Sequence, residues 1–370
     1  MTNERTQTWA STMAGFDGVG GLRVAHTGTR VGPGDGRPQT RIRREEHESM
    51  MLAPGATRAA EGGHRDTTEE PDLWRTCFER DRDRILHSTT FRRLAGKTQV
   101  FVFPADHQRT RLTHALEVAQ VAVGISQALG LNVALAEAIA LGHDCGHGPG
   151  GHASEDALSP YIDGGYDHAV WGADVTLRPL NLCLETLDGI RNHSWSRPPP
   201  RTAEGEVVAW ADRIAYVCHD FEDAAATGVV RPEQLPADIV ELIGTARSRQ
   251  ISVFITSVID AALTTGVVGM APEPAAALAA LRKFNYDNIY LRPDSQDQAR
   301  AVVALLRALV DHYLARPEHL PVDQRQQFDD TDPTHVVVSY VGGMTDRFAC
   351  RQAISLLDWP LHQLPRGIDL

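Results

Sequence analysis

The stretch Leu141–Asp156, LGHDCGHGPGGHASED, gathers histidines and carboxylates among five glycines and a proline. An apolar segment over 132–141 precedes it, and its periodicity predicts a helix that ends at His143 and Asp144. The glycines then turn the chain, and 154–158 is predicted to begin another helix. A neighbouring imidazole and carboxylate can both bind one divalent ion such as Mn, Fe, Ni, Zn or Mg. Because an HD pair alone is common, a metal site needs further ligands elsewhere in the chain.

Length and composition narrow the class of protein. With 370 residues and 42% hydrophobic content, the chain can form one large or two ordinary domains around a substantial core. The sequence has no run of 18 apolar residues and no secretory leader, and its five cysteines form no CxxC pair, so we expect a cytoplasmic protein with reduced thiols and no membrane partner. A net charge of −12 argues against a protein that coats nucleic acid. An anionic substrate would therefore need a metal and local basic groups to hold it.

The chain is predicted to be all-α, because clear strand alternation is almost absent. Residues 1–40 are glycine-rich and are interpreted as a disordered or flexible arm, although GVGG and GPGDG within them also allow phosphate loops. Residues 41–370 are interpreted as one principal domain, with a core at about 72–225 and a C-terminal helical part at about 226–370. The predicted helices lie at 111–129, 132–141, 177–193, 206–225, 236–265, 274–284 and 296–315.

Two helices carry polar side chains where apolar ones are expected. His114 shares the apolar face of 111–129, as either a hydrogen-bonded core histidine or a ligand. In 206–225 the positions of Asp212, Tyr216 and Asp220 fall on one helical face, which faces either a pocket or solvent. Together with the HD pair, the chain then has the order H…HD…D. Two imidazoles and two carboxylates can hold one divalent cation and leave sites for water and a phosphate oxygen, as phosphoester hydrolysis requires.

In this order the chain resembles the HD-domain phosphohydrolases, and within them the deoxyguanosine triphosphate triphosphohydrolase (dGTPase) and dGTPase-like branch. The resemblance runs from about residue 41 to 350 and leaves the first 40 residues unmatched. It is carried, in family order, by DRDRILHSTTFRRLAGKTQVF (81–101), RTRLTHALEVAQVA (109–122), LGHDCGHGPGGHASED (141–156), LNLCLETLDGIRNHS (180–194), ADRIAYVCHDFEDA (211–224) and YVGGMTDRFA (340–349).

The resemblance implies an all-α, metal-dependent HD phosphohydrolase that splits dGTP or several deoxynucleoside triphosphates (dNTPs) into deoxynucleoside and triphosphate. It implies a divalent metal ion (Mn, Mg, Fe or Ni) as cofactor, held by His114, His143, Asp144 and Asp212. It also implies a catalytic pair. His152 would be the general acid or base, and Glu155 would orient or tune it from the same helical face.

The resemblance also suggests substrate contacts. Gln99 and Asp220 match positions that contact the sugar 3′-hydroxyl, and Tyr216 would stack under the deoxyribose and exclude a 2′-hydroxyl. Arg111 and Arg213 match basic positions that grip the triphosphate. Further pocket residues are expected from the later helix, namely Arg282 and Tyr290, while His147 and His193 are either outer-shell or phosphate-facing groups or structural ones.

Two positions depart from the family pattern. His168 is followed by alanine where an amide side chain is expected, and Gly151 stands where a bulky residue is expected before His152. Two other functions remain open: an HD phosphohydrolase acting on another phosphorylated nucleotide, and a nucleotide-sensing or single-stranded-DNA-binding regulator with weak catalysis. The partners considered are therefore a dNTP substrate, an allosteric nucleotide or single-stranded DNA, and further copies of the chain, in a hexamer or tetramer.

Overall fold

The computed structural model describes residues 3–28, 32, 36–100, 109–329 and 331–365. The chain divides into two compact units, Met1–Thr40 and Arg41–Leu370. The first contains helix α1 (Glu4–Thr12) and a short antiparallel ladder of β1 (Phe16–Asp17) with β2 (Arg23–Val24), elements that its glycine content did not predict. Of the two glycine-rich segments, GVGG forms a turn of 3₁₀ helix, and residues 33–35 of GPGDG lie outside the described residues.

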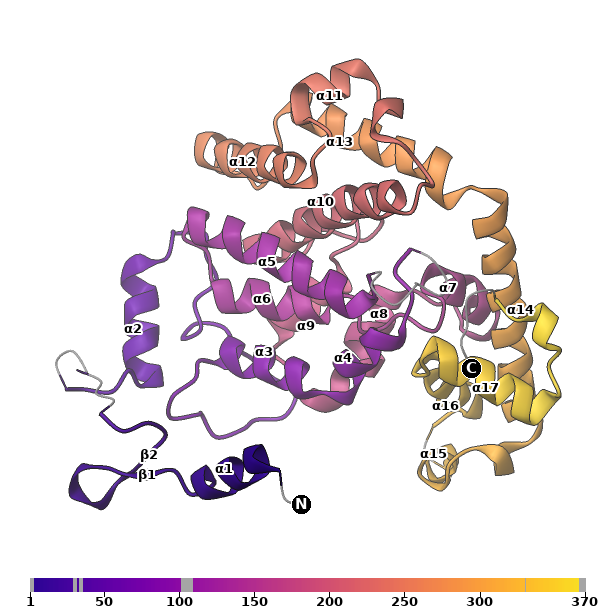
Figure 1. The fold of residues 1–370 in the computed structure, drawn as a ribbon. Coiled ribbons are helices and arrows are strands. Elements are labelled where there is room, and N and C mark those ends of the chain that lie inside the picture. The colour runs from indigo at the N-terminus through magenta and orange to yellow at the C-terminus, as the bar shows by residue number, and fades with distance from the viewer. Residues whose placement is uncertain (1–2, 29–31, 33–35, 101–108, 330, 366–370) are drawn as a thin grey trace. The chain divides into compact units, whose positions relative to one another are not determined.

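The second unit is helical throughout its described part, which confirms the predicted all-α class (Figure 1). Its first half contains α2 (Arg41–Met51), α3 (Cys77–His87), α4 (Thr89–Arg93), α5 (Arg111–Leu129), α6 (Val133–Gly142), α7 (His152–Leu158), α8 (His168–Trp171), α9 (Leu184–Arg191) and α10 (Ala203–Ala226). Its second half contains α11 (Ala237–Ile243), α12 (Arg247–Thr265), α13 (Pro272–Asn285), α14 (Pro293–Ala315), α15 (Val322–Arg325), α16 (Pro333–Gly342) and α17 (Asp346–Leu357). None of the helices among these described residues is long and apolar enough to cross a membrane.

Helix α5 forms over the predicted range because its apolar side chains repeat at helical spacing and both of its ends are marked by the sequence. It ends at Gly130, whose φ of 67° is the left-handed conformation that commonly closes a helix. The next helix, α6, begins two residues after Leu131, where the Asn132 side chain accepts a hydrogen bond from the backbone N–H of Leu135. This short connection keeps α5 and α6 in contact, and α6 then delivers the HD pair at its C-terminal end.

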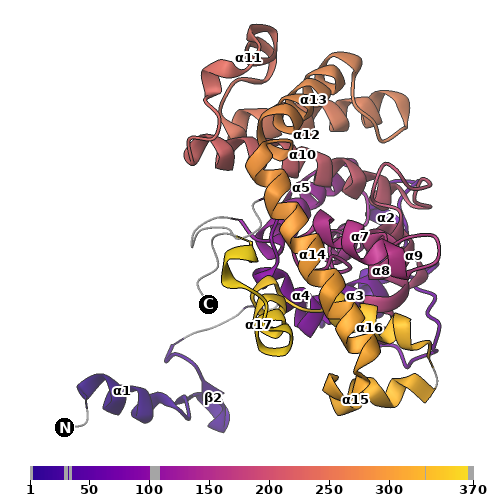
Figure 2. The same ribbon diagram turned by 90° about the vertical axis from the view of Figure 1, so that its right-hand side faces the viewer.

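The buried side chains form two clusters, and the glycine-rich loop 143–151 connects them. The larger cluster joins α3, α5, α6, α9 and α10 to α12 and α13, as Figure 1 shows around α10. The smaller cluster joins α7 to α14, α16 and α17, and Figure 2 shows α14 running the length of that side. The loop leaves α6 in the first cluster and enters α7 in the second. Residues of both clusters can therefore meet at the loop.

Two predicted helices differ from the structure. The range 236–265 was predicted as one helix, but it forms α11 and α12, because Gly244 has a φ of 72° and a ψ of −174°, which end a helix. The range 177–193 contains only one α-helix, α9, after an irregular start in which Asn181 has a φ of 49°. The first difference affects no predicted site residue, because none lies in 236–265. The second places His193 just beyond the end of α9, which stops at Arg191.

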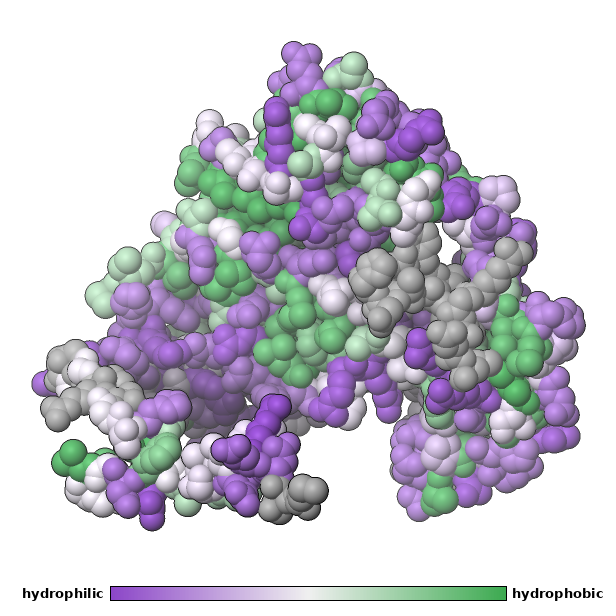
Figure 3. Space-filling model, viewed as in Figure 1, coloured by the Kyte–Doolittle hydropathy of each residue, from purple (hydrophilic) through white to green (hydrophobic). Residues whose placement is uncertain are grey.

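The face of the molecule seen in Figure 1 carries both hydrophilic and hydrophobic residues, and hydrophobic residues gather over the region of α12 and α13 (Figure 3). Exposed apolar side chains in this region of the chain include Leu263 of α12 and Val267 just beyond it. Exposed apolar side chains of this kind can be buried when copies of a chain associate. The expected hexamer or tetramer stays a prediction.

Candidate metal centre and active site

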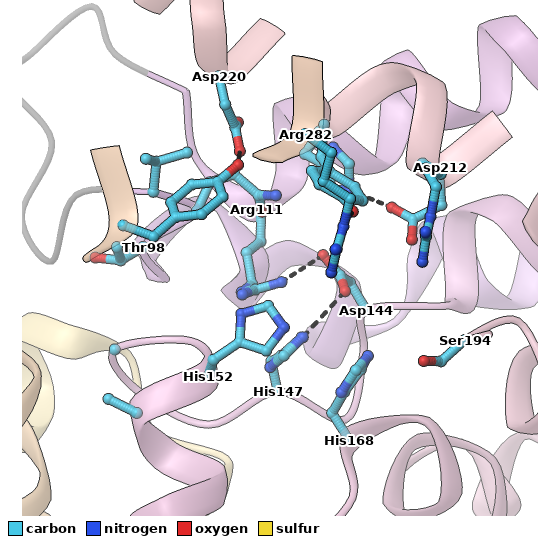
Figure 4. A pocket seen from close by; sticks show the side chains of 18 of the residues that line it. Thr98, Arg111, Asp144, His147, His152, His168, Ser194, Asp212, Asp220 and Arg282 are labelled. Atoms are coloured by element: carbon cyan, nitrogen blue, oxygen red, sulfur yellow. Dashed lines mark hydrogen bonds and ion pairs between the residues drawn. The ribbon is translucent and has the colours of Figure 1, made fainter. Parts of the chain in front are cut away.

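One cavity of about 460 Å³ lies where the two clusters meet, and most of the predicted site residues line it. Figure 4 shows its labelled side chains converging from several helices. The predicted residues in its wall are Gln99, Arg111, His114, Asp144, His147, His152, His193, Asp212, Arg213, Tyr216, Asp220, Arg282 and Tyr290. His143 and Glu155, the two remaining predicted residues, lie directly behind this wall, each in contact with a residue that lines it.

Three predicted metal ligands lie together on α5, α10 and the end of α6. The ligand atoms of His114, His143 and Asp212 all lie within 4.8 Å of one another. The Asp212 Oδ1 atom is 3.0 Å from His114 Nε2 and 3.7 Å from His143 Nε2. Burial opposes ionisation of Asp212, but the hydrogen bond from His114 and the neighbouring His143 hold its pKa below the usual range. A carboxylate that is ionised at neutral pH is what a cation requires.

The state of His143 tests whether this group fits a metal ion. Its ring is 1% exposed, and its Nδ1 atom lies 2.6 Å from the carbonyl oxygen of Ala140. A carbonyl can only accept, so Nδ1 carries a proton, and in the neutral ring that a metal ligand requires Nε2 holds the lone pair. That Nε2 atom is buried without a hydrogen-bond partner among the described residues. An orphaned lone pair that faces two other ligands fits a divalent cation, and the backbone hydrogen bond on the opposite nitrogen is the usual outer-shell support.

The fourth predicted ligand, Asp144, faces two histidines with one carboxylate oxygen and Arg111 with the other. Its Oδ1 atom lies 3.5 Å from His143 Nε2 and 3.3 Å from His147 Nε2, and Arg111 donates to its Oδ2 atom at 2.7 Å. Figure 4 shows Arg111 and His147 both pointing at this carboxylate. Burial opposes its ionisation, but the Arg111 guanidinium holds the pKa of Asp144 well below its usual range. Asp144 is thus an ionised, buried carboxylate beside the ligand group.

The predicted catalytic pair is arranged differently from the expectation. His152 is exposed to the cavity at the first position of α7, and burial of its other sides with the charges of Arg111 and His168 lowers its pKa to about 4. Glu155 was expected to orient His152. Instead its Oε1 atom accepts from His168, from the ring Nδ1 at 2.6 Å and from the backbone N–H at 2.9 Å. Burial opposes ionisation of Glu155, but this contact lowers its pKa to about 2.

His168 is the main residue that sequence reasoning missed, because it was noted only for the alanine after it. Its ring stacks on that of His147 with centroids 3.7 Å apart, and its Nε2 atom lies 3.3 Å from His193 Nε2. Burial lowers the pKa of His168, but the hydrogen bond to Glu155 outweighs it and raises that pKa overall. Glu155 therefore acts on the cavity through His168. The signal that could have found it is its position, because it is a histidine between two motifs, 141–156 and 180–194, that themselves contain histidines.

Two arginines of the cavity have no carboxylate partner among the described residues. The guanidinium of Arg213 lies over the Trp195 ring, 3.5 Å from its centroid, and Trp195 is fixed by a hydrogen bond from its Nε1 to the Ala209 carbonyl. Arg282 donates from Nε to the Tyr216 hydroxyl at 2.6 Å. Burial and the nearby charge of Arg282 lower the pKa of Arg213. Both guanidiniums are therefore positive charges held by aromatic side chains.

Arg109, unlike Arg213 and Arg282, forms an ion pair with an acidic residue of α10, Asp220. Asp220 is buried and accepts from Arg109 at 2.8 Å and from the Tyr290 hydroxyl at 2.5 Å. The Arg109 guanidinium also lies 3.3 Å from His114 Nδ1, behind the ligand group. Gln99 has a buried Oε1 atom with no partner among the described residues. An unpartnered acceptor in a cavity wall suits a hydroxyl group of a bound molecule.

Gly151 explains the departure noted in the sequence. It has a φ of 62° and a ψ of −127°, and a Cβ atom there would lie 2.6 Å from Arg111 Nη2 and 3.1 Å from the Thr98 carbonyl oxygen. A bulky side chain at this position would displace the arginine that holds Asp144. In this chain, glycine is required by the backbone and by the approach of Arg111.

Comparison with known proteins identifies the family. The pattern of the HD domain matches residues 111–217, and that of a phosphohydrolase-associated domain matches residues 268–354. Deoxyguanosinetriphosphate triphosphohydrolase-like proteins from Caldanaerobacter subterraneus subsp. tengcongensis and Clostridium perfringens strain 13 are each 39% identical, over 82% and 83% of this chain and 92% and 94% of those proteins. One from Desulfatibacillum aliphaticivorans is 36% identical over 82% of this chain and 94% of its own. With its helical fold and its group of candidate His and Asp ligands, the chain belongs to the HD-domain phosphohydrolases of the deoxyguanosinetriphosphate triphosphohydrolase-like family.

Proposed function

We propose that this protein hydrolyses deoxynucleoside triphosphates to deoxynucleoside and inorganic triphosphate with a bound divalent cation. The observation that carries the proposal is the convergence, in one cavity, of a buried ligand group, a histidine and arginines without carboxylate partners. The names of its relatives support dGTP or several dNTPs as substrates. His114, His143, Asp144 and Asp212 would hold the cation. When bound, such a cation lowers the pKa of a water and polarises the phosphorus centre.

The arginines support a polyphosphate as the substrate. Arg213 and Arg282 bring two charges to the cavity, neither of which forms an ion pair with a carboxylate among the described residues. Arg111 brings a third, because only its Nη1 atom bonds to Asp144, while its Nε and Nη2 atoms are buried without a partner among the described residues. Buried unpaired donors are costly unless a ligand accepts from them. A triphosphate offers such oxygens, and these arginines would hold it even though the chain as a whole is acidic.

His152 is the residue proposed to move a proton at the scissile bond. At neutral pH its ring is neutral, because its pKa is about 4, so one ring nitrogen is free to accept. General acid–base groups contribute typically about 10²–10⁴-fold to rate. Glu155 would hold the imidazole of His168 in place near His152. His147 and His193 contact His168 and complete the histidine cluster.

The cavity wall next to these arginines supports recognition of a deoxyribose. Tyr216 presents an aromatic face there, and its hydroxyl is fixed by Arg282. Asp220 and Gln99 are acceptors that would bind the sugar 3′-hydroxyl, with Asp220 held by Tyr290. A ring packed against the sugar would leave no space for a 2′-hydroxyl.

The test is product analysis of the purified full-length protein with each dNTP and Mn²⁺ or Mg²⁺. Anion-exchange chromatography should show triphosphate and deoxynucleoside in equal amounts. Reaction in ¹⁸O-labelled water should place one label in the triphosphate, because water attacks the α-phosphorus and the bond to the sugar oxygen breaks there. Release of pyrophosphate or monophosphate, or no turnover with or without an added second nucleotide, would contradict the proposal. Parallel assays with ribonucleotides would test the role of Tyr216.

A further inference from the structure

The motif YVGGMTDRFA (340–349) is part of the sequence resemblance and contains none of the predicted site residues. In the structure it forms the end of α16, a short turn and the start of α17. Asp346 at the start of α17 is only 5% exposed, and its carboxylate faces the glycine-rich loop. Its Oδ1 atom accepts from the Gly150 N–H at 2.8 Å, and its Oδ2 atom accepts from the backbone and hydroxyl of Thr98 at 2.9 and 2.6 Å.

A buried lysine connects the same turn to the other end of the loop. The Nζ atom of Lys97 donates to the His147 carbonyl oxygen and, at 3.0 Å, to that of Gly342 at the end of α16. Lys97 is 2% exposed, and its own carbonyl oxygen accepts from the Arg111 N–H at 3.1 Å. Lys97 and Asp346 thus bind the loop at His147 and Gly150 respectively.

The loop needs these partners because its backbone is buried, and buried N–H and C=O groups require hydrogen bonds. Some of the bonds are local. Tyr166 donates to the Gly146 carbonyl oxygen at 2.7 Å, and the Ser154 hydroxyl accepts from the Gly148 N–H at 3.0 Å and donates to the Gly151 carbonyl oxygen. The bond to Gly150, by contrast, comes from a residue 196 positions away.

The backbone at this point also needs external support. Gly150 and Gly151 have φ values of 74° and 62° in succession, and because glycine has wide conformational freedom, the two residues do not by themselves fix the path of the loop. Gly151 leads directly into His152, and Thr98 leads directly into Gln99. The carboxylate of Asp346 therefore holds the backbone next to two cavity residues that come from different segments of the chain.

We propose that Asp346 is a positioning residue, which holds the Gly150–His152 backbone and Thr98 in the geometry that the reaction requires. The α16–α17 turn then gives the phosphohydrolase-associated region a physical role in the active site. The activity part of this inference rests on the proposed function. Asp346 has no hydrogen bond to the predicted metal ligands among the described residues. Its loss is therefore expected to leave metal affinity unchanged.

The experiment compares Asp346→Ala and Asp346→Asn with Asp332→Ala as a matched control. Asp332 caps α16 and accepts from two backbone N–H groups, those of Thr334 and His335, each at 3.3 Å. Its removal weakens α16, which leads into the turn that carries Asp346, and removes no hydrogen bond to the loop among the described residues. Three quantities are measured for each full-length variant: kcat and KM for the best dNTP, Mn²⁺ affinity by calorimetry, and amide hydrogen exchange of a peptide covering 146–152.

For Asp346→Ala we expect kcat to fall by about 10–100-fold with KM changed less than about threefold, because small misplacements of reacting groups cost rates of this order. Mn²⁺ affinity should stay within about twofold of the wild type, and exchange in 146–152 should become faster. Asp332→Ala should leave kcat and the exchange of this peptide unchanged, whatever its melting temperature.

Wild-type kcat together with wild-type exchange in Asp346→Ala would overturn the proposal. So would an equal fall of kcat in Asp332→Ala, because a general loss of stability would then suffice. If the alanine variant does not fold, Asp346→Asn decides, since it keeps the volume but must lose either the Gly150 or the Thr98 backbone bond. It should show faster exchange and lower kcat, and wild-type values of both would refute the inference. A wild-type protein that releases no triphosphate would instead refute the proposed function, and the exchange data would still judge the loop contact.

Discussion

Replacing Gly151 by alanine tests how tightly the loop is fitted to Arg111. The new Cβ atom would lie 2.6 Å from Arg111 Nη2 and 3.1 Å from the Thr98 carbonyl oxygen, on a backbone with a φ of 62°. A strained conformation of this kind costs about 1–3 kcal/mol, and overpacking of a filled site costs about 1–3 kcal/mol more. We therefore expect the free energy of unfolding to fall by about 2–6 kcal/mol, which lowers Tm by roughly 3–9 °C in a unit of this size.

The chain offers a matched control in Gly124 of α5. It has helical backbone angles, and nothing lies within 4 Å of the position its Cβ would take. Alanine there should stabilise the helix by about 0.5–1 kcal/mol, because glycine is the poorer helix former. The two substitutions make the same chemical change and are expected to have opposite signs.

The assay is urea-induced unfolding of both variants followed by circular dichroism, together with kinetics on the best dNTP. Displacement of Arg111 also weakens its ion pair with Asp144, so Gly151→Ala should raise KM and lower kcat while Gly124→Ala changes neither. If Gly151→Ala unfolds at the same urea concentration as the wild type and keeps its kinetic constants, the loop can make space for a Cβ atom between Arg111 and the Thr98 carbonyl oxygen. Glycine would then not be required at position 151.

Three other substitutions test the site. Asp212→Ala should abolish Mn²⁺ binding in calorimetry and all turnover, and a chelator should lower Tm of the wild type but not of this variant; Mn²⁺ binding of wild-type strength would contradict the ligand assignment. His152→Ala should keep Mn²⁺ binding and lose about 10²–10⁴-fold in kcat, and full activity would disprove its role. Trp195→Leu removes the ring under Arg213, and loss of a cation–π contact of about 0.5–2 kcal/mol should raise KM by about 2–30-fold with kcat little changed, whereas Trp195→Phe should retain most of the affinity. An unchanged KM in Trp195→Leu would show that the stacking does not position Arg213.

The sequence predicted those parts of the structure that depend on local spacing. Helix α5 has the predicted bounds, because its apolar repeat begins and ends with the helix and Gly130 stops it. The same periodicity placed Asp212, Tyr216 and Asp220 on one face, and all three line the cavity. Periodicity does not report a single left-handed glycine inside an apolar range, which is why Gly244 was missed as the end of α11.

The missed site residues act through contacts between distant segments. His168 reaches His193 and Glu155, and Asp346 reaches Gly150, across separations that no local pattern encodes. Glu155 illustrates the same limit: helical spacing places it near His152, on whose ring its charge acts, but its hydrogen bonds go to His168 of another helix. Spacing finds which side chains can share a face, and only the tertiary structure decides which of them bond.

The arginines around the cavity fall into two groups, those paired with carboxylates and those in contact with aromatic side chains. This difference explains how an acidic chain can bind a polyanion. Arg109 is neutralised by Glu117 and Asp220, so its contact with His114 is structural. Arg213 and Arg282 rest on aromatic rings and hydroxyls, which orient a guanidinium without cancelling its charge. Because these two charges are partly withdrawn from solvent, salt should screen them less than it screens the acidic surface. A modest rise of ionic strength should therefore weaken the repulsion between the acidic chain and a triphosphate more than it weakens the attraction to these two arginines. We expect KM for dNTP to stay level or fall as salt is added. A steep rise of KM with salt would contradict this division of roles.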